Sequence, residues 1–481
     1  MAKVLLINPN RWGRGITHIW IASHSAILKK NNHEVELFDA TFYKDWSLNE
    51  IKYQSNNKMY KPSNYDKIII FKSNDVKKDL EKKIKSFKPH VVFWSALSSH
   101  IHAEGEYANI QNGYELIKDI KSNILKISGG LQATAAPEIV LNKMKKIDYL
   151  IRGESELVLL NICNLIDKKK DIKSLSGLVF KHKKKIIKNK KQNIIENLDA
   201  ISPYDYQIFD KQVLLRPYNG KIVKAVDYEL SRGCIYSCNY CVETIIQKYY
   251  NFNTFSKSTG AIKNFKSYLR HKSSKTVFGE LRFLNKQLKV ELIRCQDTNF
   301  LTNDRKILQD IANKIRKSDL NIKLYIETRP EGINKKSIEL LKDLKVDGIG
   351  MGVELADAKF REDSLNRFTN HEKIITAFKM LRKYGIKRTA YNIIGLPNQN
   401  EESILETIKF NKILDPDNIT VQFYSPYKGT KQQIIGKEQG IFDDYEFDVD
   451  SALRSKTKDQ ELNLEVLEKY KKNFVDLVKN V

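Results

Sequence analysis

Residues 224–243 read KAVDYELSRGCIYSCNYCVE, a strand-like run followed at once by three cysteines in a Cys-x3-Cys-x2-Cys arrangement. Cys234, Cys238 and Cys241 lie on one short loop, and three such thiolates can hold three irons of a [4Fe–4S] cube. The fourth iron then has no protein ligand and can bind a substrate group. An open position of this kind is what a catalytic metal site needs and a structural one avoids.

Two other interpretations of these cysteines stay open. A structural zinc site needs a fourth Cys or His ligand, and the nearest His after the cysteines, His271, is far along the chain. Three unrelated buried thiols are the other interpretation, which the strand-end position next to Gly233 disfavours. Cys163, in an apolar helical pattern, is expected to be a core residue, and Cys295 stands alone in a strand-like run.

Length and composition exclude several classes of protein. A chain of 481 residues is too long for one ordinary domain, and 41% apolar with 29% charged residues is a globular profile. No run approaches the roughly 18 apolar residues that span a bilayer, and MAKVLLINPN has the pattern of a buried strand rather than of a signal peptide. Five cysteines without an even spacing do not form a secreted disulfide framework. We therefore expect a cytoplasmic protein with no membrane span.

The net charge of +25 raises the question of nucleic acid binding. Only 16 of the 83 basic residues are Arg, the residue that nucleic acid surfaces use for bidentate contacts. The Lys excess is spread along the whole chain and indicates a compositional bias with a solvated basic surface. Nucleic acid is therefore not expected to be the main substrate.

Residues 1–160 alternate between strand and helix patterns. Strands are expected at 3–10, 33–40, 91–98, 123–130 and 147–154, with helices between them. This order predicts an α/β domain with a doubly wound, Rossmann-like parallel sheet. Ligands of such sheets bind beyond the carboxyl ends of the strands, here the loops at 8–15, 95–99 and 129–134.

Three further segments complete the predicted organisation. Residues 161–215 are rich in Lys and are expected to be a solvated basic linker around one hairpin-like segment, 176–187, with Pro203 marking a boundary. Residues 216–435 contain six strand–helix units, at 224–231, 289–297, 322–329, 346–354, 387–395 and 418–426, which predict a partial (β/α)6 TIM-type barrel. Residues 436–481 end in an amphipathic helix that is expected to pack on the barrel as a helical tail.

The cysteine motif, with Tyr240 as the aromatic residue before its third cysteine, resembles the radical S-adenosylmethionine (SAM) superfamily. CQDTNF (295–300), ETRP (327–330), GVE (352–354), GLP (395–397) and SPYKGT (425–430) follow in order at later strand ends, as in this family. The resemblance implies a [4Fe–4S] cluster on Cys234, Cys238 and Cys241, which cleaves SAM to a 5′-deoxyadenosyl radical that abstracts hydrogen from a substrate. It also implies an electron donor such as flavodoxin or ferredoxin.

The same resemblance implies which residues contact SAM. Tyr240 is expected near the adenine, Glu354 at the ribose or amino group, and Arg329 and Gly395 as further contacts. Ordinary structural roles stay open for the last three. Strand-end Glu and Arg often pair only with each other, and Gly395 before Pro397 can simply form a turn.

The first domain resembles the cobalamin-binding domain that precedes the barrel in one large class of the family. The resemblance is carried by ISGGLQATAAPE (127–138), DYLIRGESE (148–156) and SPYDYQIFD (202–210). It implies bound cobalamin, with the backbone of Gly129 and Gly130 approaching the cofactor and Ser95 and Ser98 hydrogen-bonding to it.

One departure concerns the lower cobalt ligand. The Asp-x-His-x-x-Gly motif of classical cobalamin proteins is absent, and the surroundings of His18 do not match it, so a packed histidine or one at the solvent edge is expected there. A degenerate domain that keeps the fold and binds nothing therefore stays open.

The leading functional hypothesis is a cobalamin-dependent radical SAM methyltransferase that acts on an unactivated carbon of a small-molecule substrate. A radical cyclisation or rearrangement without methyl transfer is the alternative. A tRNA-modifying enzyme ranks lower, because the methylthiotransferase branch carries three further cysteines in its first domain and none precedes Cys163 here. A protein without catalysis ranks lowest, since an exposed loop of three thiolates would be prone to oxidation.

Overall fold

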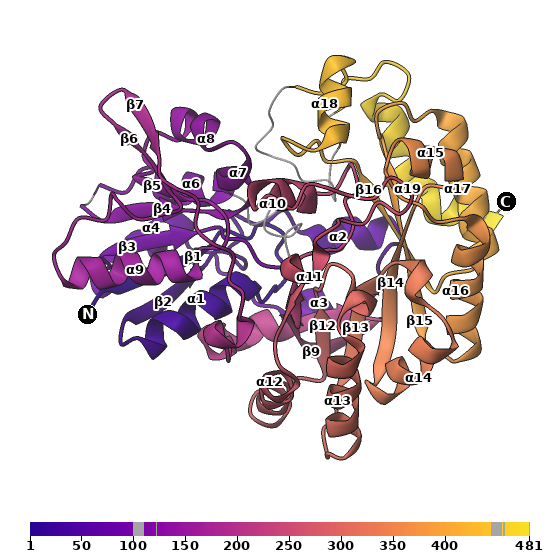
Figure 1. Cartoon of the computed structure of the whole chain (residues 1–481), viewed down its shortest axis with the longest axis horizontal. Coiled ribbons are helices and arrows are strands. Elements are labelled where there is room, and N and C mark those ends of the chain that lie inside the picture. Colours follow the sequence, from indigo (N-terminus) through magenta and orange to yellow (C-terminus); the bar gives the residue numbers. More distant parts are fainter. Residues whose placement is uncertain (100–109, 122, 444–454, 456, 481) are drawn as a thin grey trace.

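The computed structural model describes residues 1–99, 110–121, 123–443, 455 and 457–480, which form two α/β units side by side (Figure 1). The first unit is built on a seven-stranded sheet in the order β2-β1-β3-β4-β5-β6-β7. Its first five strands pair in parallel. They are β1 (Lys3–Asn8), β2 (Glu34–Asp39), β3 (Val91–Trp94), β4 (Leu125–Ser128) and β5 (Tyr149–Ile151).

Helices cover both faces of this sheet because its strands are apolar on both sides. Leu6 and Phe93 pack with α1 (Ile19–Lys30) and α9 (Glu156–Asp167) in one core cluster, and their neighbours Leu5 and Val92 pack with α4 (Val76–Phe87) in another. The expectation of a doubly wound, Rossmann-like sheet is confirmed. The other helices of this unit are α2 (Glu50–Asn56), α3 (Tyr65–Ile68), α6 (Ile110–Ile117), α7 (Gly130–Ala135) and α8 (Pro137–Lys143).

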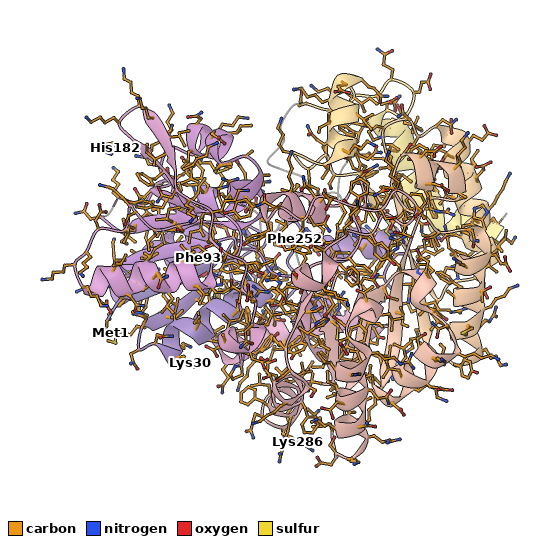
Figure 2. All side chains as sticks on the ribbon, in the orientation of Figure 1. Met1, Lys30, Phe93, His182, Phe252 and Lys286 are labelled. Atoms are coloured by element: carbon orange, nitrogen blue, oxygen red, sulfur yellow. The ribbon has the colours of Figure 1, made fainter. Side chains whose placement is uncertain are left out.

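The segment 161–215, expected to be a linker, is partly a continuation of this sheet. Its hairpin, β6 (Leu178–His182) and β7 (Lys185–Lys188), adds two antiparallel strands next to β5. The apolar start of β6 is buried against the first unit, whereas the lysine-rich tip and most of β7 are exposed, with His182 at the periphery and Phe93 in the interior (Figure 2). Three short 3₁₀ helices follow, η1 (Leu198–Ile201), η2 (Tyr206–Ile208) and η3 (Lys211–Leu214).

The second unit is the expected partial barrel. Its sheet has the order β16-β15-β14-β13-β12-β9-β8, in which all neighbours are parallel except the antiparallel edge strand β8. The strands are β8 (Leu215–Tyr218), β9 (Lys221–Tyr228), β12 (Leu292–Cys295), β13 (Lys323–Thr328), β14 (Val346–Glu354), β15 (Lys387–Ile394) and β16 (Asn418–Phe423).

Helices and short elements surround this sheet (Figure 1). The long helices are α12 (Ser274–Lys286), α13 (Arg305–Arg316), α14 (Lys335–Asp343), α16 (His371–Lys383) and α17 (Glu401–Leu414). The short elements are β10 (Ser231–Arg232), α10 (Glu243–Tyr249), α11 (Phe265–Tyr268), β11 (Arg270–His271), η4 (Phe300–Thr302), η5 (Pro330–Gly332), α15 (Ala358–Asp363) and α18 (Lys431–Glu438).

The open side of the partial barrel is covered by the part of the first unit that carries α2. Met59 packs with Ile419 and Val421 of the edge strand β16, while Pro62 lies next to Gly220 in the turn between β8 and β9. The segment therefore bridges the two edges of the sheet, and Figure 1 shows α2 among the barrel elements. The interior of the barrel is in this way walled by residues from both units.

The expected helical tail is present as α19 (Leu464–Asn480), which packs on α17 and β16. Leu467 and Phe474 lie in one apolar cluster with Ile394 and Phe423 of the sheet, so the barrel holds the helix through its apolar face. Within the described residues, no helix combines the length and the apolar character that a membrane crossing needs.

Candidate active site

The loop of three cysteines begins directly after the short strand β10. Gly233, the residue before Cys234, has a φ of +97°, and a Cβ there would overlap the backbone oxygen of Tyr268. Only glycine fits this position without displacing its neighbour. The sharp turn takes the chain from the strand end into the cysteine loop.

Backbone hydrogen bonds then shape the loop itself. The Tyr236 N–H donates to Cys234 Sγ (3.4 Å), and the Cys241 N–H donates to Cys238 O (3.0 Å). The Cys234 N–H donates to Glu243 Oε1 (3.1 Å) in the first turn of α10. All three thiols line one cavity.

Two buried carboxyl groups support the ends of the loop. Glu243 also accepts from the Tyr268 hydroxyl (2.6 Å). Asp297, in the CQDTNF segment after β12, accepts from the Ser231 backbone N–H (2.8 Å) and from the Leu230 N–H (3.2 Å). Burial raises the pKa of Asp297 to about 6, against the effect of these hydrogen bonds. Both ends of the cysteine loop are thus fixed by side chains from other elements.

The donor set and its placement fit an iron–sulfur cluster. Among the described residues, no three His, Cys, Asp or Glu side chains gather closely enough to hold a single metal ion. Cluster thiolates each bind a different iron, so they need only face one shared space, as these three do. Without iron, burial raises the pKa of Cys234 to about 12 and that of Cys241 well above its usual value.

Tyr240 joins the cysteine loop to the end of β14. Its hydroxyl donates to Glu354 Oε1 (2.8 Å), and Arg367 Nη1 lies 3.3 Å from the same oxygen. Glu354 has a φ of +64°, a left-handed conformation that is rare for a residue other than glycine. Such strain is typical of functional sites, where the surrounding contacts hold it in place. Arg367 supplies one of them by donating to Gly352 O (2.5 Å).

Arg329 presents unused hydrogen-bond donors to the same cavity. The residue is 7% exposed, and its Nη2 donates to Glu331 Oε1 (2.7 Å) and Thr369 Oγ1 (3.2 Å). Its Nε and Nη1 are buried without a hydrogen-bond partner in the described structure. The guanidinium lies 3.8 Å from the ring centre of Tyr236 in the cysteine loop. Buried unpaired donors of a cation fit an anionic group such as the carboxylate of SAM.

The cavity has a volume of about 510 Å³ and is lined by both units. The loops after β1 and β3 contribute Trp12, Arg14 and Ser99, and the α2 segment contributes Glu50 and further residues. Ser99 Oγ is buried without a hydrogen-bond partner in the described part of the chain. The first unit therefore offers a polar atom to the space that the cysteines face.

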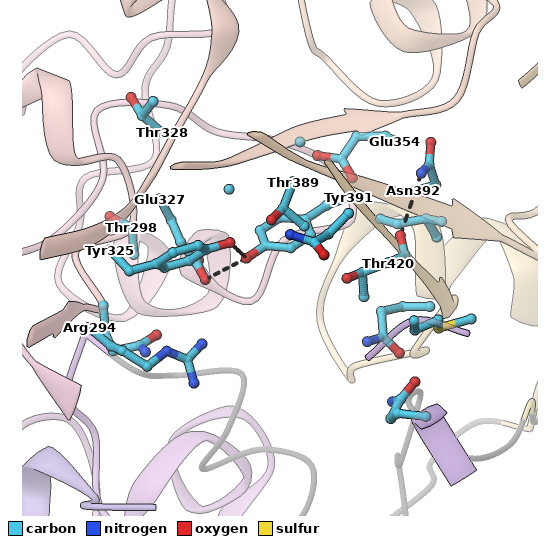
Figure 3. Close-up of a pocket in the computed structure, with 18 of the residues that line it drawn as sticks. Arg294, Thr298, Tyr325, Glu327, Thr328, Glu354, Thr389, Tyr391, Asn392 and Thr420 are labelled. Atoms are coloured by element: carbon cyan, nitrogen blue, oxygen red, sulfur yellow. Dashed lines mark hydrogen bonds between the residues drawn. The ribbon is translucent and has the colours of Figure 1, made fainter. Parts of the chain in front are cut away.

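Deeper in the barrel, polar side chains of neighbouring strands point into the same cavity (Figure 3). The hydroxyl groups of Tyr325 and Tyr391 lie 2.9 Å apart, and Tyr391 donates to Glu327 Oε1 (3.2 Å). Burial raises the pKa of Glu327, and the nearby charge of Arg294 opposes this shift. A Cβ at Gly350 would overlap Tyr391, so glycine there makes room for the tyrosine.

A buried ion network joins the two units directly behind the cysteine loop. Arg232 lies 2.7 Å from Glu156, 2.8 Å from Glu229 and 3.5 Å from Glu154, and Arg270 lies 2.9 Å from Glu154. Both glutamates of the RGESE segment thus pair with the barrel. Because Arg232 is two residues before Cys234, the network sets the position of the first unit relative to the loop.

A family model supplies the observation that decides the class of this site. The model described as the Radical SAM superfamily matches residues 228–410, which include the three cysteines and the strands β12 to β15. The chain carries a radical SAM domain.

Three similar proteins extend this finding. An uncharacterized methyltransferase of Pyrococcus horikoshii, PH0819, is 26% identical over 355 residues, 73% of this chain and 70% of that protein. An anaerobic magnesium-protoporphyrin IX monomethyl ester cyclase of Rubrivivax gelatinosus is 25% identical over 380 residues, 77% of this chain and 63% of that protein.

Among solved structures, the radical SAM methyltransferase TsrM of Kitasatospora setae, with cobalamin and a [4Fe–4S] cluster bound, has a TM-score of 0.67. It is 15% identical, and the match covers 92% of this chain and 79% of that chain. The match therefore extends over both units, so the fold of the first unit, and not only that of the radical SAM domain, is similar to a solved structure.

Some predicted site residues lie elsewhere. Gly395 is outside the described cavity lining, and its φ of +80° makes a turn whose N–H donates to Gln399 Oε1 (2.7 Å). A Cβ there would lie 2.8 Å from Leu467 of α19. Gly395 therefore has a structural role in a turn, and its contact with SAM stays a prediction. His271 accepts from the Asp304 N–H (3.2 Å) and is also outside that lining.

The four residues predicted to contact cobalamin also lie outside the described cavity lining. The Gly129 N–H donates to Ser95 O (2.9 Å), and a Cβ at Gly130 would lie 2.5 Å from Ser95 Oγ. The glycines allow two loops of the first unit to approach each other. Ser98, three residues after Ser95, is buried. His18 is fully buried, as expected for a packed histidine, and burial lowers its pKa to about 3.

The sequence interpretation missed several cavity residues. Arg294 directly precedes Cys295, and Glu327 was noted only as part of ETRP. Alternation along a strand places Tyr325 and Glu327 on one face of β13, which was the signal available for Glu327. Arg367 follows a loop after α15 and carries no comparable pattern.

Proposed function

We propose that this protein is a cobalamin-dependent radical SAM methyltransferase that methylates an unactivated carbon of a small molecule. The observation that carries the proposal is one shared cavity. It is lined by the cysteine loop, by Arg329 and Glu354, and by the loops after β1 and β3 of the first unit. When bound, the cluster supplies the electron that cleaves SAM to a 5′-deoxyadenosyl radical, and cobalamin supplies the methyl group.

In this proposal the protein binds and orients the groups that react. Cys234, Cys238 and Cys241 hold the cluster, and Arg329 holds the carboxylate of SAM through its unpaired donors. Glu354, kept in place by Tyr240 and Arg367, accepts a hydrogen bond from SAM. The segment that carries α2 covers the open side of the barrel and so keeps bulk water from the reacting groups.

Cobalamin binding is supported by the loops after β1 and β3, which carry Trp12, Arg14 and Ser99 at the cavity. Carboxyl-end loops are where doubly wound sheets bind their ligands. TsrM, which has the same two-unit fold, was solved with cobalamin bound. These three residues are proposed as contacts from their place at the cavity, and contacts by the four residues that the resemblance implies stay a prediction.

A radical cyclisation without methyl transfer is the second candidate. It is favoured by the similarity to the anaerobic cyclase of Rubrivivax gelatinosus. Both candidates use the same cysteines and the same cavity, so the products of SAM distinguish them.

We further propose a cytoplasmic location and an external one-electron donor such as flavodoxin or ferredoxin. An iron–sulfur cluster with an open iron needs a reducing compartment, and the free thiols are consistent with one.

The experiment is anaerobic reconstitution of the full chain with iron, sulfide, cobalamin, SAM and candidate substrates, followed by mass identification of every SAM product. Methyl transfer predicts one 5′-deoxyadenosine and one S-adenosylhomocysteine per turnover, with a labelled methyl group in the product. Product and 5′-deoxyadenosine without S-adenosylhomocysteine would support the cyclase candidate instead. The triple Cys234→Ala, Cys238→Ala, Cys241→Ala variant should cleave no SAM, whereas Cys163→Ala should cleave it normally.

A further inference from the structure

The charged side chains of both units around the inner end of the cavity are mostly paired with one another. Arg14 lies 3.0 Å from Glu50, and Arg216 lies 2.7 Å from Asp227, with all four side chains buried. Neither pair leaves a full charge for a ligand to neutralise. Any charge recognition at this end of the cavity must come from other residues.

Arg294 is a cavity-lining cation whose charge is not neutralised in this way. Its one ion pair among the described residues is with Asp227 at 4.0 Å, beyond hydrogen-bond distance. Asp227 is already held by Arg216, by the Thr17 N–H (3.2 Å) and by Gln296 Nε2 (2.9 Å). The guanidinium of Arg294 therefore keeps its donors for something in the cavity.

Glu327 is the matching carboxyl group. Within the described part of the chain its one hydrogen bond comes from Tyr391, at 3.2 Å to Oε1, which leaves Oε2 to the cavity. No described cation lies within ion-pair distance of it. Glu327 is half-buried, and a carboxyl group that is partly removed from water is stabilised in its ionised form by a cationic or hydrogen-bonding partner.

The two side chains are close enough to bind one small molecule. Arg294 of β12 pairs in register with Tyr325 of β13, and Glu327 is two residues further along the same face. The Cα atoms of Arg294 and Glu327 are then roughly 8 Å apart, from a strand spacing of about 4.8 Å and a rise of about 3.3 Å per residue. Figure 3 shows both side chains directed into the same pocket.

We propose that Arg294 and Glu327 bind the carboxylate and the ammonium group of one aminocarboxylate substrate, an amino acid or a close derivative. This inference rests on the proposed function, for which it names the substrate class. An anion alone would leave Glu327 unpaired, and an amine alone would leave Arg294 unpaired. A zwitterion pairs both charges in one step and buries none alone.

This anchor directs the rest of the substrate toward the reacting groups. Arg329 follows Glu327 by two residues, directly after the end of β13 that faces the cysteine loop. A molecule held at Arg294 and Glu327 therefore extends its side chain along the strands toward the proposed SAM site. The carbon that reacts is then expected in the side chain, away from the anchored groups.

The test is anaerobic equilibrium dialysis of the full chain, reconstituted with its cluster and SAM, against each proteinogenic L-amino acid. At least one should bind saturably. Its decarboxylated amine and its deaminated acid should each bind roughly 10-fold more weakly or worse. Arg294→Gln should remove the preference for the amino acid over the amine, and Glu327→Gln the preference over the acid.

The matched control is Lys61→Gln, which removes a cavity-lining charge outside this anchor and should leave amino acid binding intact. SAM binding in the same variants shows that they are folded. Absence of binding by every amino acid, or an unchanged preference in Arg294→Gln, would overturn the inference. Because dialysis needs no turnover, intact SAM cleavage without amino acid binding rejects only the substrate class, whereas loss of the cluster rejects the proposed function.

Discussion

Replacement of Arg232 by Met should destabilise the fold more than any surface change, because Arg232 is the centre of the ion network between the two units. Its side chain is 3% exposed and pairs with Glu154, Glu156 and Glu229. Arg270 can still compensate Glu154, at 2.9 Å. The carboxylates of Glu156 and Glu229 would stay buried without their cation.

Two estimates give the loss in free energy of unfolding that Arg232→Met should cause. Removing one partner from a buried ion pair costs roughly 3–5 kcal/mol of unfolding free energy. Burial acts to raise the pKa of Glu156, but the charge of Arg232, the next largest effect, acts together with His24 and with hydrogen bonds to lower the pKa from 4.5 to about 2. A shift of that size corresponds to roughly 3 kcal/mol, which agrees with the first figure.

The assay is urea unfolding of the full chain, followed by circular dichroism over a range of pH. A carboxyl group with a lowered folded pKa stabilises above its unfolded pKa and loses this effect as the pH falls toward the folded value. The difference between wild type and Arg232→Met should therefore be largest near neutral pH and shrink between 4.5 and about 2. The control, Arg382→Met, breaks an exposed pair and should cost less than about 1 kcal/mol. Equal losses in the two variants, or a difference independent of pH, would refute the role of the network.

Three further outcomes are expected. Gly350→Ala should lower the free energy of unfolding by roughly 1–3 kcal/mol in urea unfolding, because its Cβ overlaps Tyr391. Adding Tyr391→Phe should recover part of this loss, and no recovery would place the clash elsewhere. Arg329→Met should weaken SAM binding by about 30-fold in equilibrium dialysis with the iron content unchanged, whereas Arg388→Met, outside the described cavity lining, should not. Gly395→Ala should lower the melting temperature but leave SAM affinity unchanged, and a large loss of affinity would restore Gly395 as a SAM contact.

The strands and the cysteine site could be predicted because their signals are local. Continuous apolar runs such as 3–8 and the spacing of Cys234, Cys238 and Cys241 are properties of short segments. The hairpin β6–β7 matches the hairpin-like segment predicted at 176–187, but its lysine-rich surroundings favoured a linker rather than a part of the sheet. Its place next to β5 depends on a pairing between segments that the local pattern does not encode.

The cavity residues illustrate the same limit. Gly129 and Gly130 are predicted to let the backbone approach a cofactor, and the structure shows that they also make room for Ser95, a contact between two strand ends. Arg294 becomes available because Asp227 is held by Thr17, a residue of the other unit. Such roles depend on which distant segments meet, and only the folded structure contains that information.

The most direct test of the account is the electron paramagnetic resonance spectrum of the reduced, anaerobically reconstituted full chain with and without SAM. The three cysteines and the unpaired donors of Arg329 predict a [4Fe–4S] signal that changes when SAM binds the open iron. The triple cysteine-to-alanine variant should show no signal, and Cys163→Ala should show the wild-type one. A cluster that persists in the triple variant, or a wild-type spectrum unaffected by SAM, would contradict the account.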